Sequence, residues 1–164
     1  MSTGRLTFFC GKMGSGKSTR AIQIAQQSNA VLISEDEWLA SLYPAEISSL
    51  ADYIAYAARL KPPIKQVVQS ILSAGTPVVM DFPANTLSQR EWFRGIFSEI
   101  GALHDLVYID LPDEVCLEQI AKRRTEQPER ASTDTAAMFH QVPPYFKAPT
   151  LEEGFHIIHV VPEP

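Results

Sequence analysis

A glycine-rich segment near the N-terminus constrains this 164-residue chain more than any other feature. Residues 11–18 read G-K-M-G-S-G-K-S and match the pattern G-x-x-x-x-G-K-[ST] at every fixed position. With glycine at ~7% of residues, a match by chance anywhere in the chain has a probability below about 1%. An apolar run at 6–10 precedes the segment, and a helical pattern at 17–27 follows it. The sequence therefore predicts a phosphate-binding loop between a buried strand and a helix.

The fixed positions of this loop each have a chemical reason. Glycines allow a tight turn whose backbone N–H groups point at phosphate oxygens, and the next helix presents its positive end to the same anion. Lys17 is expected to reach the β- and γ-phosphates, and the Ser18 hydroxyl to bind Mg²⁺. We therefore expect ATP, as a nucleoside triphosphate, to be held by Gly11, Lys12, Met13, Gly14, Ser15, Gly16, Lys17, Ser18 and Thr19.

Apolar runs and helical patterns alternate along the chain. Pro62 and Pro63 are expected to end one helix and begin the next. The alternation predicts an α/β fold of the P-loop NTPase type, with a five-stranded parallel sheet, helices on both faces and one domain over residues 1–164. Strands are predicted at 6–10, 30–33, 77–80, 106–109 and 155–161, and helical segments at 17–27, 38–43, 46–60, 62–73, 86–100, 112–124 and 134–141.

Composition narrows the class of protein further. Lys and Arg number 14 against 19 Asp and Glu, so the net charge is −5 and a general nucleic-acid or membrane-surface binder is disfavoured. No run approaches the ~18 apolar residues that a membrane span requires. Cys10 and Cys116 each lie in an apolar stretch and are expected to be small core residues rather than a disulfide. We expect a cytoplasmic protein.

Two aspartates lie where predicted strands end, at the edge of the sheet where parallel α/β folds bind ligands. Asp81 follows the apolar residues 78–80 and is expected to support Mg²⁺, although it could serve only as a turn or N-cap carboxylate. Asp36 is the candidate general base for an acceptor hydroxyl. The alternative for Asp36 is that residues 34–37 form only the acidic first turn of a helix.

Cations gather at the end of the predicted helix 112–124 and in the polar segment after it, at Lys122, Arg123, Arg124 and Arg130. One interpretation is a lid over about 122–135 whose arginines neutralise the γ-phosphate. The other is a solvated helix C-terminus, where cations complement the helix dipole. Arg90 and Arg94 could orient a substrate or face solvent.

The sequence resembles the small P-loop kinases, a group with polynucleotide kinase, zeta-toxin-like, gluconate-kinase-like and chloramphenicol-phosphotransferase-like members. It is most similar to the subgroup of predicted kinases and AAA-family ATP-binding proteins. The resemblance covers essentially the whole chain. It rests on residues 11–19, 34–36, Asp81, Asn85, Thr86, Arg90, 110–112, Arg123, 145–146, Pro149 and 152–155.

The resemblance implies roles for individual residues. Asp36 matches the general base of the polynucleotide kinase motif, and Arg123 matches the arginine at the lid edge that lies against adenine or phosphate. Together with Lys17, these are the expected catalytic residues, and Arg130 is a further expected ligand of the nucleotide. The motif has an arginine immediately before the base, where this chain has Glu35. An acid there would repel a nucleic-acid phosphate.

Together these patterns predict a Mg-ATP-dependent kinase that phosphorylates a hydroxyl group of a small molecule, with Ser18 and Asp81 at the metal. A nucleotide-binding ATPase or switch without an acceptor is the first alternative, and a nucleic-acid 5′-end kinase is the second. The acceptor pocket is expected between Trp38 and Leu60, where Tyr53 and Tyr56 suit many small polar molecules. The acceptor, the choice of ATP over GTP and the oligomeric state stay open.

Overall fold

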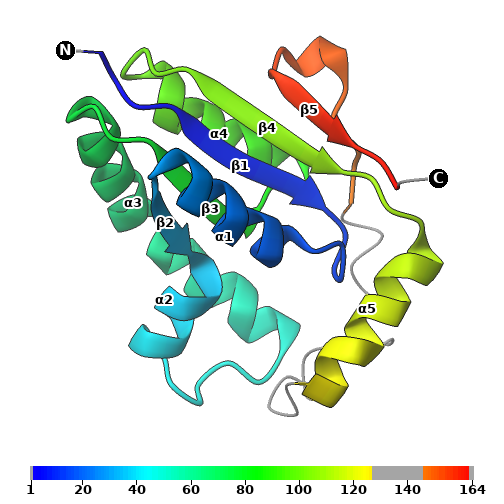
Figure 1. Ribbon diagram of the computed structural model, residues 1–164. Coiled ribbons are helices and arrows are strands. Elements are labelled where there is room, and N and C mark those ends of the chain that lie inside the picture. Colours follow the sequence, from blue (N-terminus) through cyan, green and yellow to red (C-terminus); the bar gives the residue numbers. More distant parts are fainter. Residues whose placement is uncertain (1, 127–145, 163–164) are drawn as a thin grey trace.

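The strands form one parallel sheet, as predicted. The computed structural model describes residues 2–126 and 146–162. The sheet has five strands in the order β2-β3-β1-β4-β5, and every neighbouring pair is parallel (Figure 1). Its strands are β1 (Leu6–Gly11), β2 (Val31–Ser34), β3 (Val78–Pro83), β4 (His104–Ile109) and β5 (Ile157–Val160).

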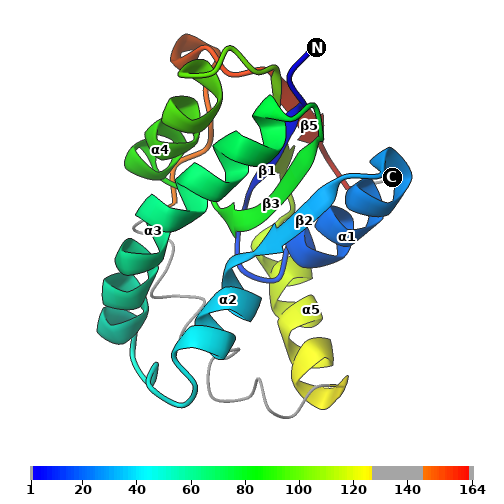
Figure 2. The same cartoon turned by 90° about the vertical axis from the view of Figure 1, so that its left-hand side faces the viewer.

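Helices lie on both faces of the sheet (Figure 2). They are α1 (Lys17–Ser28), α2 (Glu35–Leu42), α3 (Leu50–Ser73), α4 (Leu87–Ser98) and α5 (Asp113–Glu126), with a short 3₁₀ turn at Leu151–Glu153. The predicted helix at 134–141 and the part of the predicted lid beyond residue 126, including Arg130, lie outside the described residues.

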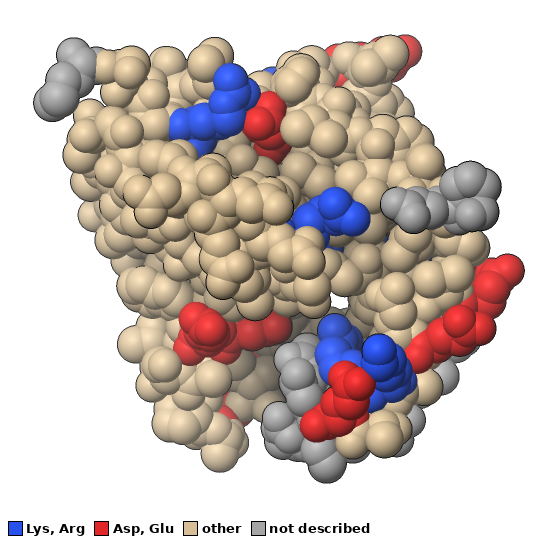
Figure 3. Space-filling model, viewed as in Figure 1, with Lys and Arg blue, Asp and Glu red and all other residues tan. Residues whose placement is uncertain are grey.

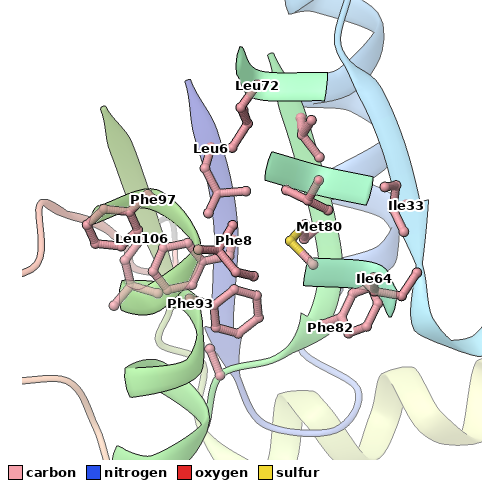
Figure 4. Close-up of a cluster of buried hydrophobic side chains, with 14 of the residues drawn as sticks. Leu6, Phe8, Ile33, Ile64, Leu72, Met80, Phe82, Phe93, Phe97 and Leu106 are labelled. Atoms are coloured by element: carbon pink, nitrogen blue, oxygen red, sulfur yellow. The ribbon is translucent and has the colours of Figure 1, made fainter. Parts of the chain in front are cut away.

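The central strand β1 supplies both layers of the core. Phe8 packs with the buried residues of α3 and α4, and its ring stacks on Phe93 at 4.4 Å between centroids (Figure 4). Its neighbour Phe9 points to the other face, where it packs with Ala21 and Ala25 of α1. Alternation along a strand buried on both faces explains why residues 6–10 are continuously apolar. The cysteines are free and buried, as expected.

The predicted break at Pro62 and Pro63 is wrong, because α3 runs through both prolines. Its buried face continues across them at helical spacing, through Leu60, Ile64 and Val68. The prolines and the residues four positions before them are exposed, so the carbonyl groups that lose a helical donor can be hydrated. Packing of the long apolar face outweighs the local preference for a break.

The elements around the carboxyl edge of the sheet also differ in their bounds from the prediction. Helix α2 begins at Glu35, because the Ser34 hydroxyl accepts the N–H of Glu37 and caps the first turn. Asp81 lies within β3 rather than after it. A bulge between Phe8 and Phe9 moves the pairing of β1 forward, while Asp81 stays paired with Ser34 of β2.

Candidate active site

The glycine-rich loop connects β1 to α1 at the carboxyl edge of the sheet. Gly14 and Gly16 have φ angles of 80° and 87°, in the left-handed region that glycine adopts without steric cost. Helix α1 begins at Lys17, and no side chain caps its N-terminus. Its first N–H groups and its positive dipole end therefore face the loop. This turn and the open helix end fit a phosphate group.

Ser18 and Asp81 lie together beside this loop. The Ser18 hydroxyl donates to Asp81 Oδ2 at 2.7 Å, although the two residues are 63 positions apart in sequence. A hydroxyl and a carboxylate are hard oxygen ligands, the kind that Mg²⁺ prefers. The described residues contain no group of three or more His, Cys, Asp or Glu placed to hold a metal. Two protein oxygens nevertheless fit Mg²⁺, which usually takes its other ligands from phosphates and water.

Helix α5 packs directly on the loop. A Cβ atom on Gly14 would lie 2.4 Å from the Cys116 carbonyl oxygen, so only glycine fits there. Met13 packs against the buried pair Cys116 and Ile120. Lys12 Nζ forms an ion pair with Asp113 at 2.8 Å, so this side chain ties the loop to the start of α5.

The described cations of the predicted lid lie on α5 itself. The helix continues to Glu126, so Lys122 and Arg123 are helical. Lys122 is exposed and lies 3.9 Å from Glu126. Arg123 is half-buried on this helix, which lies beside the loop in Figure 1. In Figure 3, both acidic and basic side chains lie over α5, whereas the charged side chains over α2 are acidic.

The first turn of α2 contains two carboxylates in different environments. Asp36 is exposed, whereas Glu35 is 3% exposed and accepts a hydrogen bond from the Tyr53 hydroxyl. Burial raises the pKa of Glu35 to about 7, although the Tyr53 hydrogen bond and the charge of Lys17 oppose the shift. Burial and the nearby Glu35 raise the pKa of Tyr53, which therefore stays a donor. A carboxyl group that is partly neutral repels phosphate less than the sequence suggested.

Arg90 and Arg94 both contact the C-terminal segment. Arg90 is fully buried and does not face solvent; its Nε donates to Glu153 Oε1 at 2.7 Å. Arg94 pairs with Glu91 at 3.0 Å and lies over the Phe155 ring. Both side chains therefore contact the C-terminal segment, whereas the sequence left open whether they orient a substrate or face solvent.

Sequence reasoning gave Asn85 no role at the glycine-rich loop and considered it only as an alternative to Thr86 for the N-cap of α4, a place that Thr86 takes. Its Oδ1 accepts the Gly11 N–H at 2.9 Å in a buried contact, at the first residue of the loop. The only sequence signal was its place in the resemblance to the small P-loop kinases. Similarly, the Glu35–Tyr53 contact joins residues 18 positions apart and leaves no local pattern.

The parallel sheet, the loop after β1 and the Ser18–Asp81 pair define a P-loop NTPase of the kinase-like kind. A family model described as an AAA domain matches residues 6–144. The chain belongs to this AAA domain family. Comparison with curated proteins finds no match. In the described part of the chain, no helix has the length and apolarity needed to cross a membrane.

Solved structures with this fold include several kinases. The APS kinase CysC of Mycobacterium tuberculosis, in complex with AMPPNP and APS, is 18% identical with a TM-score of 0.69, over 100% of this chain and 91% of that one. A candidate kinase from Chloroflexus aurantiacus is 19% identical with a TM-score of 0.75, over 98% and 86%. Kti12 of Chaetomium thermophilum, in complex with ADP-AlF3, is 17% identical with a TM-score of 0.65, over 95% and 87%. At these identities the similarity shows the fold.

Proposed function

We propose that this protein is a Mg-ATP-dependent kinase that transfers the γ-phosphoryl group to a hydroxyl group of a small molecule. The observation that carries this proposal is the contact between Ser18 and Asp81 at 2.7 Å, directly beside the glycine-rich loop. It puts a hydroxyl and a carboxylate, two kinds of ligand that Mg²⁺ accepts, beside the loop that we propose binds the triphosphate. Similar folds bound to AMPPNP or to ADP-AlF3 support nucleotide binding here.

In this proposal the loop and α1 hold and orient the triphosphate. The loop N–H groups other than those of Gly11 and Ser15, which already have acceptors within the protein, and the Lys17 ammonium bind its phosphate oxygens. Ser18 and Asp81 would hold Mg²⁺, which would supply positive charge to neutralise the phosphates. Arg123 on α5 supplies further positive charge. Most of the rate acceleration would come from this positioning and charge, as in phosphoryl transfer generally.

Asp36 is the proposed base in the transfer step. The acceptor hydroxyl oxygen forms a bond to the γ-phosphorus, and the bond from that phosphorus to the β–γ bridging oxygen breaks, so ADP leaves. The hydroxyl proton passes to the Asp36 carboxylate. Asp36 lies two residues beyond β2, at the same sheet edge as the loop, and its exposed position leaves it accessible to a substrate.

The acceptor would bind along α2 and α3. Tyr43 and Tyr56 lie with ring centroids 4.3 Å apart, and Arg59 lies over the Tyr56 ring. Aromatic and polar groups of this kind suit a small hydroxylated molecule. The exposed acids Asp36 and Glu37 in the first turn of α2 disfavour a strongly anionic acceptor and hence a nucleic-acid end.

The test is a transfer assay with radiolabelled ATP against sugars, nucleosides, aminoglycosides and nucleic-acid 5′-ends. We expect label on a small molecule, and we expect Asp36→Asn to reduce transfer by ~10²–10⁴-fold with near-normal ATP affinity. Asp81→Asn should also alter the Mg²⁺ dependence. Tight nucleotide binding with no acceptor would instead indicate the switch, and label on nucleic-acid ends the 5′-end kinase. Full transfer by Asp36→Asn would show that another group is the base.

A further inference from the structure

Asn85 lies between the glycine-rich loop and the C-terminal segment. Its side-chain Oδ1 accepts the Gly11 N–H, and the main-chain carbonyl of the same residue accepts the Lys147 N–H at 2.7 Å. Gly11 is tightly placed, because a Cβ there would lie 2.6 Å from Ser15 Oγ. A shift of Asn85 would therefore move the first residue of the loop, and with it the N–H groups proposed to bind phosphate.

Arg90 holds both segments that meet at Asn85. Its Nη1 donates to the Ala84 carbonyl at 3.0 Å and to the Lys147 carbonyl at 2.8 Å. The guanidinium is fully buried, so these contacts are shielded from water. Arg90 thus holds both Ala84, which precedes Asn85, and Lys147, whose N–H is hydrogen-bonded to the Asn85 carbonyl.

Glu153 fixes Arg90 in turn. Its Oε1 accepts Arg90 Nε at 2.7 Å, and its Oε2 accepts the Thr150 N–H at 2.9 Å. Arg94 donates to the main-chain carbonyl of Glu153. A buried ion pair contributes little net stability, because desolvation of both charges offsets their attraction. The ion pair instead fixes the position of Arg90, because the orientation of its side chain depends on the 3₁₀ turn at Leu151–Glu153.

We propose that Asn85 is a positioning residue of the nucleotide site, and that the ion pair between the buried Arg90 and the partly buried Glu153 makes residues 146–153 part of that site. The contacts form a continuous path from Glu153 through Arg90 and Lys147 to Asn85 and Gly11. Figures 1 and 2 show this C-terminal segment, in orange, beside the sheet and α4. The proposal rests on the nucleotide binding proposed above.

Two variants break the path at different points. Asn85→Ala removes the acceptor of the Gly11 N–H, and we expect about 10-fold weaker Mg-ATP binding by calorimetry, as for the loss of one buried hydrogen bond. Glu153→Gln weakens the hold on Arg90, and we expect a loss of about 3- to 10-fold. The matched control is Glu99→Gln, which removes a surface ion pair between Lys65 and Glu99 and should leave the affinity unchanged. All are compared at temperatures well below unfolding.

A second readout needs no nucleotide. The exchange rate of the Gly11 amide, followed by NMR, should rise in Asn85→Ala and in Glu153→Gln, and stay slow in Asn85→Asp, which keeps an acceptor oxygen. Unchanged Gly11 exchange in Glu153→Gln would overturn the proposal whatever the affinity. The proposal would also be overturned if Asn85→Ala kept the full Mg-ATP affinity while Lys17→Ala lost affinity. A wild-type protein that binds no Mg-ATP would overturn the proposed function instead.

Discussion

Neighbouring residues at the start of α2 show how burial separates two similar side chains. Glu35 is enclosed by α2 and α3 and bonded by Tyr53, whereas Asp36 lies at the surface one residue later. Lys17 and Lys61 lie close enough to favour the charged form of Glu35, and Asp36 disfavours it. Desolvation outweighs the two cations. The exposed Asp36 is therefore suited to meet a substrate, and the buried Glu35 to hold α2 against α3.

The raised pKa of Glu35 predicts how stability depends on pH. The folded protein binds the Glu35 proton more tightly than the unfolded chain, so this contribution is present below about pH 4.5 and is lost as the pH rises through about 7. Glu35→Gln keeps an acceptor for Tyr53 and does not ionise. We expect the variant to gain stability relative to wild type between about pH 5 and about pH 8, by on the order of 1–3 kcal/mol.

Urea unfolding of wild type and of Glu35→Gln at about pH 5 and at about pH 8 measures the difference between their free energies of unfolding. Glu37→Gln is the matched control, because Glu37 lies on the same turn but is exposed. A difference between Glu35→Gln and wild type that does not change with pH would show that Glu35 ionises normally in the folded protein.

Among the elements, α3 departs most from what its local sequence favours. Two consecutive prolines lie inside a 24-residue helix and remove two hydrogen-bond donors. The helix persists because its apolar residues on both sides of the prolines, from Leu60 to Leu72, are buried in the core. Local preference and packing are therefore in conflict at Pro62 and Pro63.

Removing that conflict should stabilise the protein. Pro62→Ala/Pro63→Ala restores donors to the carbonyls of Ala58 and Arg59, and we expect the free energy of unfolding to rise by about 2 kcal/mol. The gain is reduced because proline also restricts the unfolded chain. Chemical denaturation measures it, with Pro44→Ala in the exposed turn after α2 as control. A double variant no more stable than wild type would show that the prolines cost α3 nothing.

For the molecule as a whole, α5 is the element whose position should respond to ligand. It contacts the loop through Gly14, Met13 and Lys12, and its buried residues are Cys116 and Ile120. An element with so few buried side chains opens more easily than the core helices. A phosphate group in the loop would tighten the surface on which α5 packs.

Hydrogen exchange tests this coupling. We expect slower exchange in residues 113–126 when AMPPNP and Mg²⁺ are added, because closing the loop around phosphate stabilises its contact with α5. Residues 64–73 of α3, which pack in the core on the other face of the sheet, should be unaffected. Protection of residues 11–18 without protection of α5 would show that the helix and the loop are independent.

The sequence by itself determined the loop, the strand–helix alternation and the sheet edge that holds Asp36 and Asp81. These are local properties: glycine spacing sets a turn, and periodicity sets an element and its buried face. Because parallel strands end at one edge, the candidate site residues could be named before their distances were known. Their roles were argued from chemistry and position, and the resemblance added the match of Arg123 to a lid-edge arginine.

The tertiary structure decided the contacts that hold this site in place. Gly11 meets Asn85 across 74 positions, and Arg90 meets Glu153 across 63. Such pairs depend on the strand order β2-β3-β1-β4-β5 and on the burial that follows from it, which no local pattern encodes. The same holds for α3, where packing along the sheet overrides two prolines, and for Glu35, whose pKa is set by what covers it. The type of each residue sets what its side chain can do chemically. Burial by distant segments then determines which charge state and which contacts the side chain has in the folded protein.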